Sequence, residues 1–493
     1  MKFANAINIR EARTENGMKA LASSASKCVD LFASIGASRG KDVIPSFVGA
    51  YTENTDYALR IAQWARDVRG GSGERKIFRD ILTYLAKNNS VNAEKMLSKV
   101  PELGRWDDLW SIYGINEKLD TKIVDLVAEE LLKGNGLLAK WLPRQKEIIN
   151  GKDFTKAVRE RLHLSPKEYR KFVVANTNVV EQYMCSGKWD GINFSHVPSL
   201  AHSRYKKAFY KNAEDSYKSY VEALVKNDGT AKINAGAVYP YDIIKGFFKR
   251  VYAGYSSYSG YGASYAGYGK SYNETERAVI NEQWKALPDY LGDNSVLALV
   301  DVSGSMDSPV AGNPNLTAMD VAVSMGLYTA DKLKGDFKDC FLTFDTTPQL
   351  YNLKGDIVDK LTQMANSKWG GSTNLHAAFD LILATAVKGN VSPDDMPKTL
   401  VIFSDMQFNS CVRFDDSAIE MIARKYSTAG YAMPKVVFWN LREAGNRPVT
   451  FDQRGVALVS GFSPSTLRSI LSAKEFTPEA VMLETILNPR YDL

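Results

Sequence analysis

The chain has 493 residues, of which 45% are apolar, and this length predicts two or three domains with substantial cores. Since no apolar run reaches 18 residues and the start is polar, the sequence predicts neither a transmembrane helix nor a signal peptide. Residues 1–290 hold 44 Lys and Arg against 33 Asp and Glu, whereas residues 291–493 hold 18 against 23. The basic first part suggests an anionic partner, although a solvated surface without a partner would give the same balance.

The spacing of the cysteines indicates the cellular compartment of the protein. Cys28, Cys185, Cys340 and Cys411 lie far apart and form no CxxC pair. This spacing favours reduced thiols in a cytoplasmic protein over a disulfide framework or a zinc site.

Residues 1–250 predict a succession of amphipathic helices. From Asp56 to Asp67 the apolar residues recur on one helical face, and Gly70 and Gly71 then supply the backbone freedom that a helix end requires. Comparable patterns occupy residues 74–87, 120–132, 140–149, 166–174 and 203–225. Helices of this length with short breaks indicate stacked pairs, and so an α-solenoid.

Residues 251–272 are rich in Tyr, Gly and Ser and poor in charged and aliphatic residues. This composition is typical of a flexible insert. Stacking of the tyrosines on single-stranded bases is an alternative, although Lys270 is the one basic residue of the tract. Residues 273–290 then predict a connecting helix.

Residues 291–493 alternate between buried strands and amphipathic helices. The predicted strands are 295–301, 339–345, 398–404, 434–440 and 455–460, and the predicted helices are 316–333, 374–387 and 416–428. This alternation is typical of a doubly wound parallel sheet in an α/β domain.

Oxygen-bearing side chains follow the ends of the predicted strands. Asp301, Ser303 and Ser305 form an Asp-x-Ser-x-Ser pattern after the first strand, which suits either a capped turn or a site for a hard cation. Thr373 comes before a helix, after Gly370, Gly371 and Ser372, and Asp405 ends the strand that begins near residue 398. Because ligands bind at the carboxyl ends of such strands, the three loops together favour one octahedral Mg²⁺.

These three motifs resemble the metal-ion-dependent adhesion site of the von Willebrand factor A fold, and the resemblance covers about 200 residues. It implies that Ser303, Ser305 and Thr373 bind the ion directly and that Asp301 and Asp405 bind it directly or through water. In that family a carboxylate of a partner protein completes the coordination. The resemblance therefore implies a binding module and not an enzyme.

The helical part resembles the TROVE family, to which the Ro autoantigen belongs, and most closely a divergent branch found in plants, microbes and phages. The resemblance rests on the segments 59–75, 103–110 and 139–144, with further matches at 197–201, 231–235, 438–442 and 455–462. It implies a ring of HEAT-like helical repeats, followed by the A-type domain, that binds single-stranded ends or small structured RNA.

The sequence thus predicts a non-catalytic, Ro-like RNA-binding protein with one divalent cation. Its candidate RNA-binding residues are basic side chains of the helical part: Arg69, Arg75, Lys76, Arg105, Lys140, Arg144, Lys206 and Lys207. Any of them beside an acidic residue could instead form an ion pair of the fold. The alternative function is a protein-interaction or assembly module, for instance a phage structural or decoration protein, whose metal site binds an acidic residue of its partner.

Two enzymatic interpretations have less support. His376 lies one turn into the helix after Thr373, where a buried or surface histidine is the simpler explanation. His196 and His202 follow Cys185, but the sequence assigns no third residue that would orient a Cys-His pair.

Overall fold

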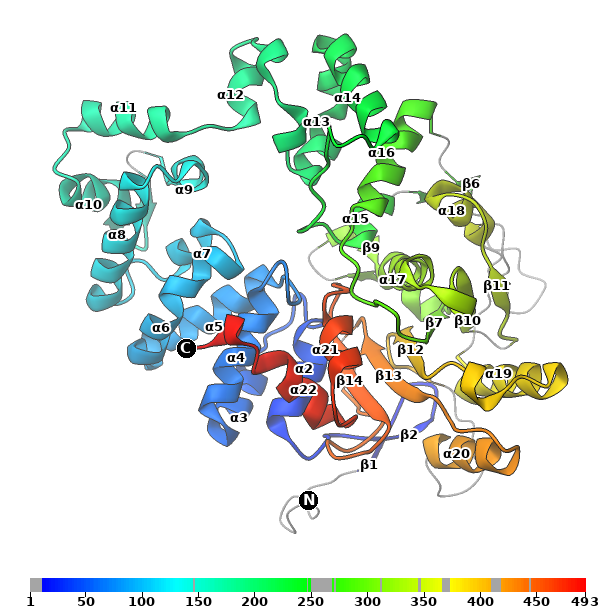
Figure 1. Cartoon of the computed structure of the whole chain (residues 1–493). Coiled ribbons are helices and arrows are strands. Elements are labelled where there is room, and N and C mark those ends of the chain that lie inside the picture. The colour runs from blue at the N-terminus through cyan, green and yellow to red at the C-terminus, as the bar shows by residue number, and fades with distance from the viewer. Residues whose placement is uncertain are drawn as a thin grey trace, which may run out of the picture. The chain divides into compact units, whose positions relative to one another are not determined.

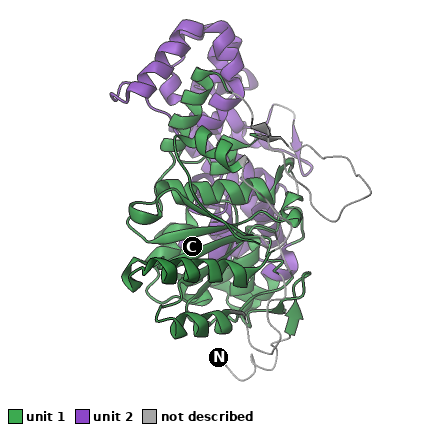
Figure 2. Ribbon diagram, turned by 90° about the vertical axis from the view of Figure 1, so that its right-hand side faces the viewer, with its two compact units in different colours: residues 1–42, 48–58, 235–490 green, residues 43–47, 59–234, 491–493 purple. Residues whose placement is uncertain are grey.

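The computed structural model describes residues 11–144, 147–245, 247–249, 268–269, 272–310, 313–344, 347–365, 373–408, 418–442 and 445–493. The chain divides into two compact units, which Figure 2 distinguishes by colour. Unit 1 comprises residues 1–42, 48–58 and 235–490, and unit 2 comprises residues 43–47, 59–234 and 491–493. The predicted division at residue 250 differs from this one, because the start of the chain groups with the C-terminal half.

Unit 1 is built on a six-stranded sheet with the strand order β11-β10-β7-β12-β13-β14 (Figure 1). Five strands are parallel: β7 (Val296–Asp301), β10 (Cys340–Phe344), β12 (Thr399–Ser404), β13 (Lys435–Asn440) and β14 (Val456–Ser460). Each begins and ends within one residue of a predicted strand. The sixth strand, β11 (Leu350–Asn352), pairs antiparallel with β10 at the edge of the sheet. It was not predicted, because three residues are too few to show an alternation of apolar and polar side chains.

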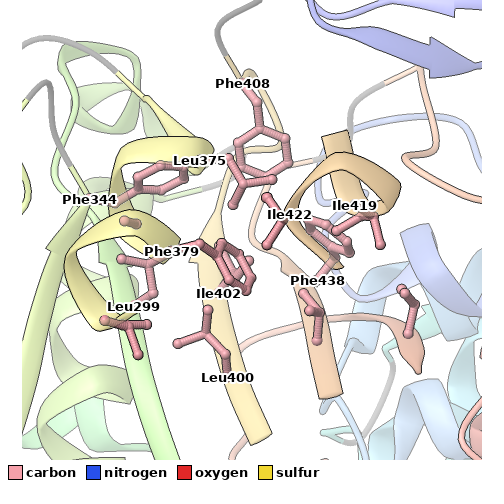
Figure 3. Packing of buried hydrophobic residues seen from close by; sticks show 14 of the residues in the cluster. Leu299, Phe344, Leu375, Phe379, Leu400, Ile402, Phe408, Ile419, Ile422 and Phe438 are labelled. Atoms are coloured by element: carbon pink, nitrogen blue, oxygen red, sulfur yellow. The ribbon is translucent and has the colours of Figure 1, made fainter. Parts of the chain in front are cut away.

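Helices cover both faces of this sheet. The helices of unit 1 are α2 (Lys27–Ile35), α15 (Pro240–Ile244), α16 (Glu274–Lys285), α17 (Ala318–Lys332), α18 (Ile357–Ala365), α19 (Leu375–Gly389), α20 (Ala418–Thr428), α21 (Thr466–Ser472) and α22 (Pro478–Ile486). Leu299, Ile402 and Phe438 lie on one face of the strands and pack with Phe379 of α19 and Ile422 of α20 (Figure 3). Helix α17 contacts β7, β10 and β12, and α2 and α22 contact β14.

Two glycines allow helices to approach this sheet closely. A Cβ at Gly326 of α17 would lie 2.3 Å from Cγ2 of Val300. A Cβ at Gly36, directly after α2, would lie 2.7 Å from Cα of Gly461. Ser460 also donates a hydrogen bond to the carbonyl of Phe32 at 3.0 Å, so α2 is fixed to the end of β14.

The N-terminal segment contributes a β-hairpin as well, β1 (Glu11–Arg13) with β2 (Lys19–Leu21). Shorter pairs are β5 (Phe248–Lys249) with β6 (Tyr268–Gly269) and β8 (Pro309–Val310) with β9 (Asn313–Thr317).

Most of the tyrosine-rich insert at 251–272 lies outside the described residues. The predicted helix at 273–290 is present as α16.

Unit 2 consists mainly of helices. They are α5 (Arg75–Asn88), α6 (Ser90–Met96), α7 (Val100–Leu103), α8 (Glu117–Leu132), α9 (Gly136–Trp141), α10 (Phe154–Arg161), α11 (Pro166–Asn176), α12 (Val180–Cys185), α13 (Ser199–Asn212) and α14 (Glu214–Lys226). Helices α3 (Ile44–Glu53) and α4 (Thr55–Arg66) belong partly to each unit. Successive helices pack together, as α5 does with α6 and α13 with α14, which is compatible with helical repeats.

The helix predicted over residues 140–149 is wrong in its bounds. Helix α9 ends at Trp141, because Pro143 disfavours a helical conformation at Leu142. A hairpin follows, with β3 (Ile148–Ile149) pairing with β4 (Lys152–Asp153). Its turn residues Asn150 and Gly151 have φ of 44° and 82°, the positive values that a two-residue turn of type I′ requires.

Among the residues that the structure describes, no helix is long and apolar enough to cross a membrane.

Candidate functional site

The predicted metal residues lie at the point where the strand order of the sheet reverses. Strands β7 and β12 are neighbours, whereas β10, which follows β7 in the chain, lies on the other side of β7. The register pairs Val300 with Phe403, so Asp301 ends one strand beside Ser404 and Asp405 of the next. Ligands of doubly wound sheets bind outside the carboxyl ends of the strands at this point.

Asp301 is fully buried, and hydrogen bonds from two neighbouring loops hold its carboxylate. Its Oδ1 accepts from the backbone N–H of Ser303 at 3.0 Å, and its Oδ2 accepts from the hydroxyl of Ser404 at 2.6 Å. The hydroxyls of Ser303 and Ser305 lie 3.1 Å apart. Although Ser303 occupies the N-cap position of the short 3₁₀ helix at Gly304–Asp307, its side chain accepts no capping hydrogen bond there. Asp301 thus forms the turn contact that the capped-turn alternative predicts, whereas Ser303 does not cap the helix and its hydroxyl lies beside that of Ser305.

Asp405 has one carboxylate oxygen without a partner. Its Oδ1 accepts from the backbone N–H of Gln407 at 3.3 Å, but its buried Oδ2 has no hydrogen-bond partner among the described residues. Burial raises the pKa of Asp405, although the nearby Ser305 hydroxyl opposes this. Burial, followed by repulsion from Asp405, raises the pKa of Asp301 to about 7. The two buried carboxyls repel each other, and one of them has an oxygen without a hydrogen bond. A bound cation would neutralise their negative charge.

The donors at this position are carboxyls and hydroxyls in equal number, from Asp301, Asp405, Ser303 and Ser305. The described residues contain no group of three or more His, Cys, Asp or Glu side chains that could bind a metal ion. A hard cation would therefore need serine or threonine oxygens in addition to the two aspartates. The donor set that the structure gathers, two carboxyls and two hydroxyls, is compatible with that requirement.

Thr373 lies near this group. It is buried, and its hydroxyl donates to the backbone carbonyl of Gln407 at 2.6 Å, two residues after Asp405. Asn374, not Thr373, caps α19, because its side chain accepts from the N–H of Ala377. The preceding residues 366–372, including Ser372 and both glycines of the motif, lie outside the described residues.

Sequence reasoning missed several contributors to this region. Ser404 lies next to a predicted ligand, so its place at the strand end was a usable signal. The β1–β2 hairpin gave no such signal, since it lies almost 400 positions away in the chain. Its Thr14 hydroxyl donates to the Phe408 carbonyl at 2.5 Å, and the Glu15 N–H donates to Oε1 of Gln407 at 2.7 Å.

Four of the candidate RNA-binding residues make contacts inside unit 2. Arg69 donates to the Glu102 carbonyl at 3.1 Å, and Lys76 pairs with Asp80 at 2.5 Å. Arg105 pairs with Asp107 at 3.1 Å, and its guanidinium lies 3.7 Å from the centre of the Trp141 ring. Lys140 pairs with Glu181 at 2.8 Å. Arg75, Arg144 and Lys207 are exposed, and Lys206 is half-buried.

The segments 59–75 and 103–110 build a buried charge network together with Arg79. Asp108 is fully buried and accepts from Nε of Arg66 at 2.6 Å and from Nε of Arg79 at 2.7 Å. A Cβ at Gly104 would lie 2.5 Å from both Nε of Arg66 and Oδ2 of Asp108, so this glycine leaves room for the pair. Breaking a buried pair of this kind is strongly destabilising, which assigns a structural role to these residues.

The basic charge of unit 2 is concentrated in its second part. Residues 43–47 and 59–132 of unit 2 hold 12 Lys and Arg against 12 Asp and Glu, whereas residues 133–234 hold 19 against 10. The net charges are 0 and +9, so an anionic partner would favour the segment that begins near α9.

His202 and His376 make packing and ion-pair contacts within the fold. His202 is 1% exposed and lies among the rings of Phe194, Phe209, Tyr217 and Tyr220. His376 pairs with Asp380 at 3.2 Å along α19. The buried Nε2 of His202 has no hydrogen-bond partner among the described residues.

Comparison with known proteins gives family matches without a function. Residues 14–99 and 117–297 match the family described as a domain of unknown function (DUF2828), which together is more than half of the chain. Residues 295–487 match a second family, described as a domain of unknown function (DUF7788).

Two individual proteins are similar along most of the chain. Uncharacterized protein L728 of Acanthamoeba polyphaga mimivirus is 31% identical over 535 residues, which cover 97% of this chain and 88% of that protein. The crystal structure of the Deinococcus radiodurans RO (RSR) protein aligns with 94% of this chain and 99% of its own, at 15% identity and a TM-score of 0.34. At this TM-score the alignment supports no argument about fold or function.

Proposed function

The chain belongs to the family described as a domain of unknown function (DUF2828), and we propose that it is a non-catalytic RNA-binding protein. In this proposal unit 2 binds single-stranded or small structured RNA through its second, basic part. Its helices belong to a HEAT-like ring, as in the TROVE proteins that the sequence resembles, and unit 1 is an A-type domain with one Mg²⁺. The site of action is the cytoplasm.

One observation carries the RNA proposal: the net charge of +9 over residues 133–234, where the elements present basic side chains to solvent. The exposed residues include Arg144, Lys171 and Lys207. A surface of this kind binds phosphates regardless of base sequence, and its affinity falls steeply with salt because counterions are released.

The test compares two double charge reversals by fluorescence anisotropy with a labelled 20-nucleotide single-stranded RNA. We expect roughly tenfold or greater weakening between 50 and 200 mM salt, which corresponds to several phosphate contacts. Lys171→Glu with Lys207→Glu should weaken binding about tenfold or more at 50 mM. Lys87→Glu with Lys95→Glu is the matched control, since these exposed lysines lie in the part of unit 2 with no net charge. Absence of binding at 50 mM, or equal loss in both variants, contradicts the proposal.

The unsatisfied Oδ2 of Asp405 supports a second function, a protein-interaction module that binds an acidic side chain of its partner through the metal ion. Asp301, Ser303, Ser305, Thr373 and Asp405 would hold the ion. When bound, the ion would neutralise the two aspartates and accept one further carboxylate.

This second function is tested by affinity capture of partner proteins with wild type and Asp405→Asn, each with Mg²⁺ or with EDTA. A partner that requires both Mg²⁺ and Asp405 supports the metal-dependent contact. A partner retained under all four conditions excludes it.

A further inference from the structure

A cavity of about 300 Å³ lies within unit 2, lined by residues of α9, α12 and α13 and of the segment 191–198. Its floor is apolar and includes the buried side chains of Ile192 and Val197. Its rim is polar and exposed, with Asn178, Asn193 and His196. The volume lies at the small end of the range for ligand sites, and the lining suits a flat ring with polar edges.

The walls of this cavity are joined by one carboxylate. Oε1 of Glu181 on α12 accepts from Nζ of Lys140 on α9 at 2.8 Å and from the hydroxyl of Tyr205 on α13 at 3.0 Å. These two hydrogen bonds hold three helices together at the cavity. The site is therefore formed before a ligand arrives, which lowers the entropic cost of binding. One of them pairs Lys140, a predicted RNA-binding residue, with Glu181.

The charge around the cavity indicates the class of ligand. The cavity lies within the segment 133–234, whose net charge is +9. Exposed basic residues occur on or next to its elements: Lys171 on α11, Lys188 after α12, and Arg204 and Lys207 on α13. An apolar, polar-rimmed cavity in a basic segment fits a ligand with a flat ring between negative groups, and a nucleotide within an RNA strand has this form.

We propose that this cavity holds one unstacked base of single-stranded RNA, with the adjoining phosphates on basic residues of α11 and α13. The inference rests on the proposed RNA-binding function and adds a base-binding position to it. If the protein contacted only phosphates, it would bind a strand with bases and a strand without bases with the same affinity. If the cavity holds a base, the strand with bases should bind more tightly.

The test uses two fluorescein-labelled strands, an eight-nucleotide oligouridine and the same sugar-phosphate strand without bases. For wild type we expect the strand without bases to bind at least tenfold more weakly. Ala201→Trp places a large ring in the cavity wall, so it should lower the affinity for oligouridine to that of the baseless strand and leave the latter unchanged. Ala208→Trp, at a similarly half-buried position on the same helix but outside the lining, should bind both strands as wild type does.

A second measurement on wild type does not depend on a folded variant. Oligouridine with 4-thiouridine is crosslinked by ultraviolet light, and the adducts are located by mass spectrometry. Adducts within residues 137–140 or 178–201 support the inference, and adducts confined to other segments overturn it. Equal affinity for the two strands overturns the cavity inference alone, whereas no binding of either strand overturns the proposed function with it.

Discussion

Asp301 and Asp405 make the metal-free protein sensitive to pH. Burial, followed by repulsion from Asp405, raises the pKa of Asp301 to about 7, whereas an unfolded aspartate titrates near 3.9. Folding therefore favours the protonated form, so its stabilising contribution is complete below about pH 4 and is lost as the pH rises through about 7. In EDTA, we predict that the free energy of unfolding of unit 1 falls between pH 5 and 8, by up to about 1.4 kcal/mol per pH unit. Urea denaturation measures this.

Two comparisons attribute that pH dependence to the site. Mg²⁺ should stabilise wild type more at pH 8 than at pH 6, because the ion binds the ionised carboxylates. Asp301→Asn removes the titrating group, so both the pH dependence and the response to Mg²⁺ should shrink. An unchanged slope in Asp301→Asn would show that other groups cause it.

At the scale of elements, the docking of α2 on β14 depends on the absence of a side chain at Gly36. A Cβ there would lie 2.7 Å from Cα of Gly461, and backbone atoms cannot move away as a flexible side chain can. We predict that Gly36→Ala destabilises unit 1 by about 1–3 kcal/mol, the usual cost of overpacking. Gly49→Ala in α3 is the matched control, since its Cβ would lie 3.8 Å from the nearest atom of Lys27 and should be neutral or stabilising. The denaturation midpoint should therefore fall in Gly36→Ala and stay the same or rise in Gly49→Ala.

The same elements show which parts of the fold the sequence could predict. Strands such as β7 and β12 are buried on both faces, so they appear as continuous apolar runs with clear ends. The assignment of α2 to unit 1 was not predictable, because an amphipathic face indicates burial but not the partner that covers it. The hairpin at 148–153 could not be predicted for a different reason. Each of its strands has two residues, which is too short to show an alternation of apolar and polar side chains.

At the scale of the whole molecule, the candidate metal site was predictable in its parts and not in its surroundings. Asp301 ends one predicted strand and Asp405 directly follows another, and adjacent parallel strands bring such ends together. The contact between Thr14 and Phe408 joins segments 394 positions apart, and no local pattern encodes it. The candidate RNA-binding residues were chosen by their charge. Only the structure shows that Lys140 forms an ion pair with Glu181 and that Arg105 forms one with Asp107.

The two units should respond to mild acid in opposite directions when no metal is present. Burial lowers the pKa of His202 in unit 2 to about 4, against an ordinary value of 6.5. Folding favours the neutral ring, so its contribution is complete above about pH 6.5 and is lost as the pH falls through about 4. In EDTA, a change from pH 7 to 5 should therefore destabilise unit 2 while protonation of Asp301 stabilises unit 1.

Hydrogen exchange measures the two opposite pH responses within one molecule, because the protection of each amide depends on the stability of the unit in which it lies. After correction for the intrinsic exchange rate, protection in α13 should decrease from pH 7 to 5 and protection in β7 and β12 should increase. His202→Phe keeps a ring among Phe194, Phe209 and Tyr217 but cannot be protonated, so it should abolish much of the change in α13 and leave the strands as they are. A uniform change throughout the chain, unaltered by this substitution, would mean that the two units unfold as one and that neither buried group governs the response.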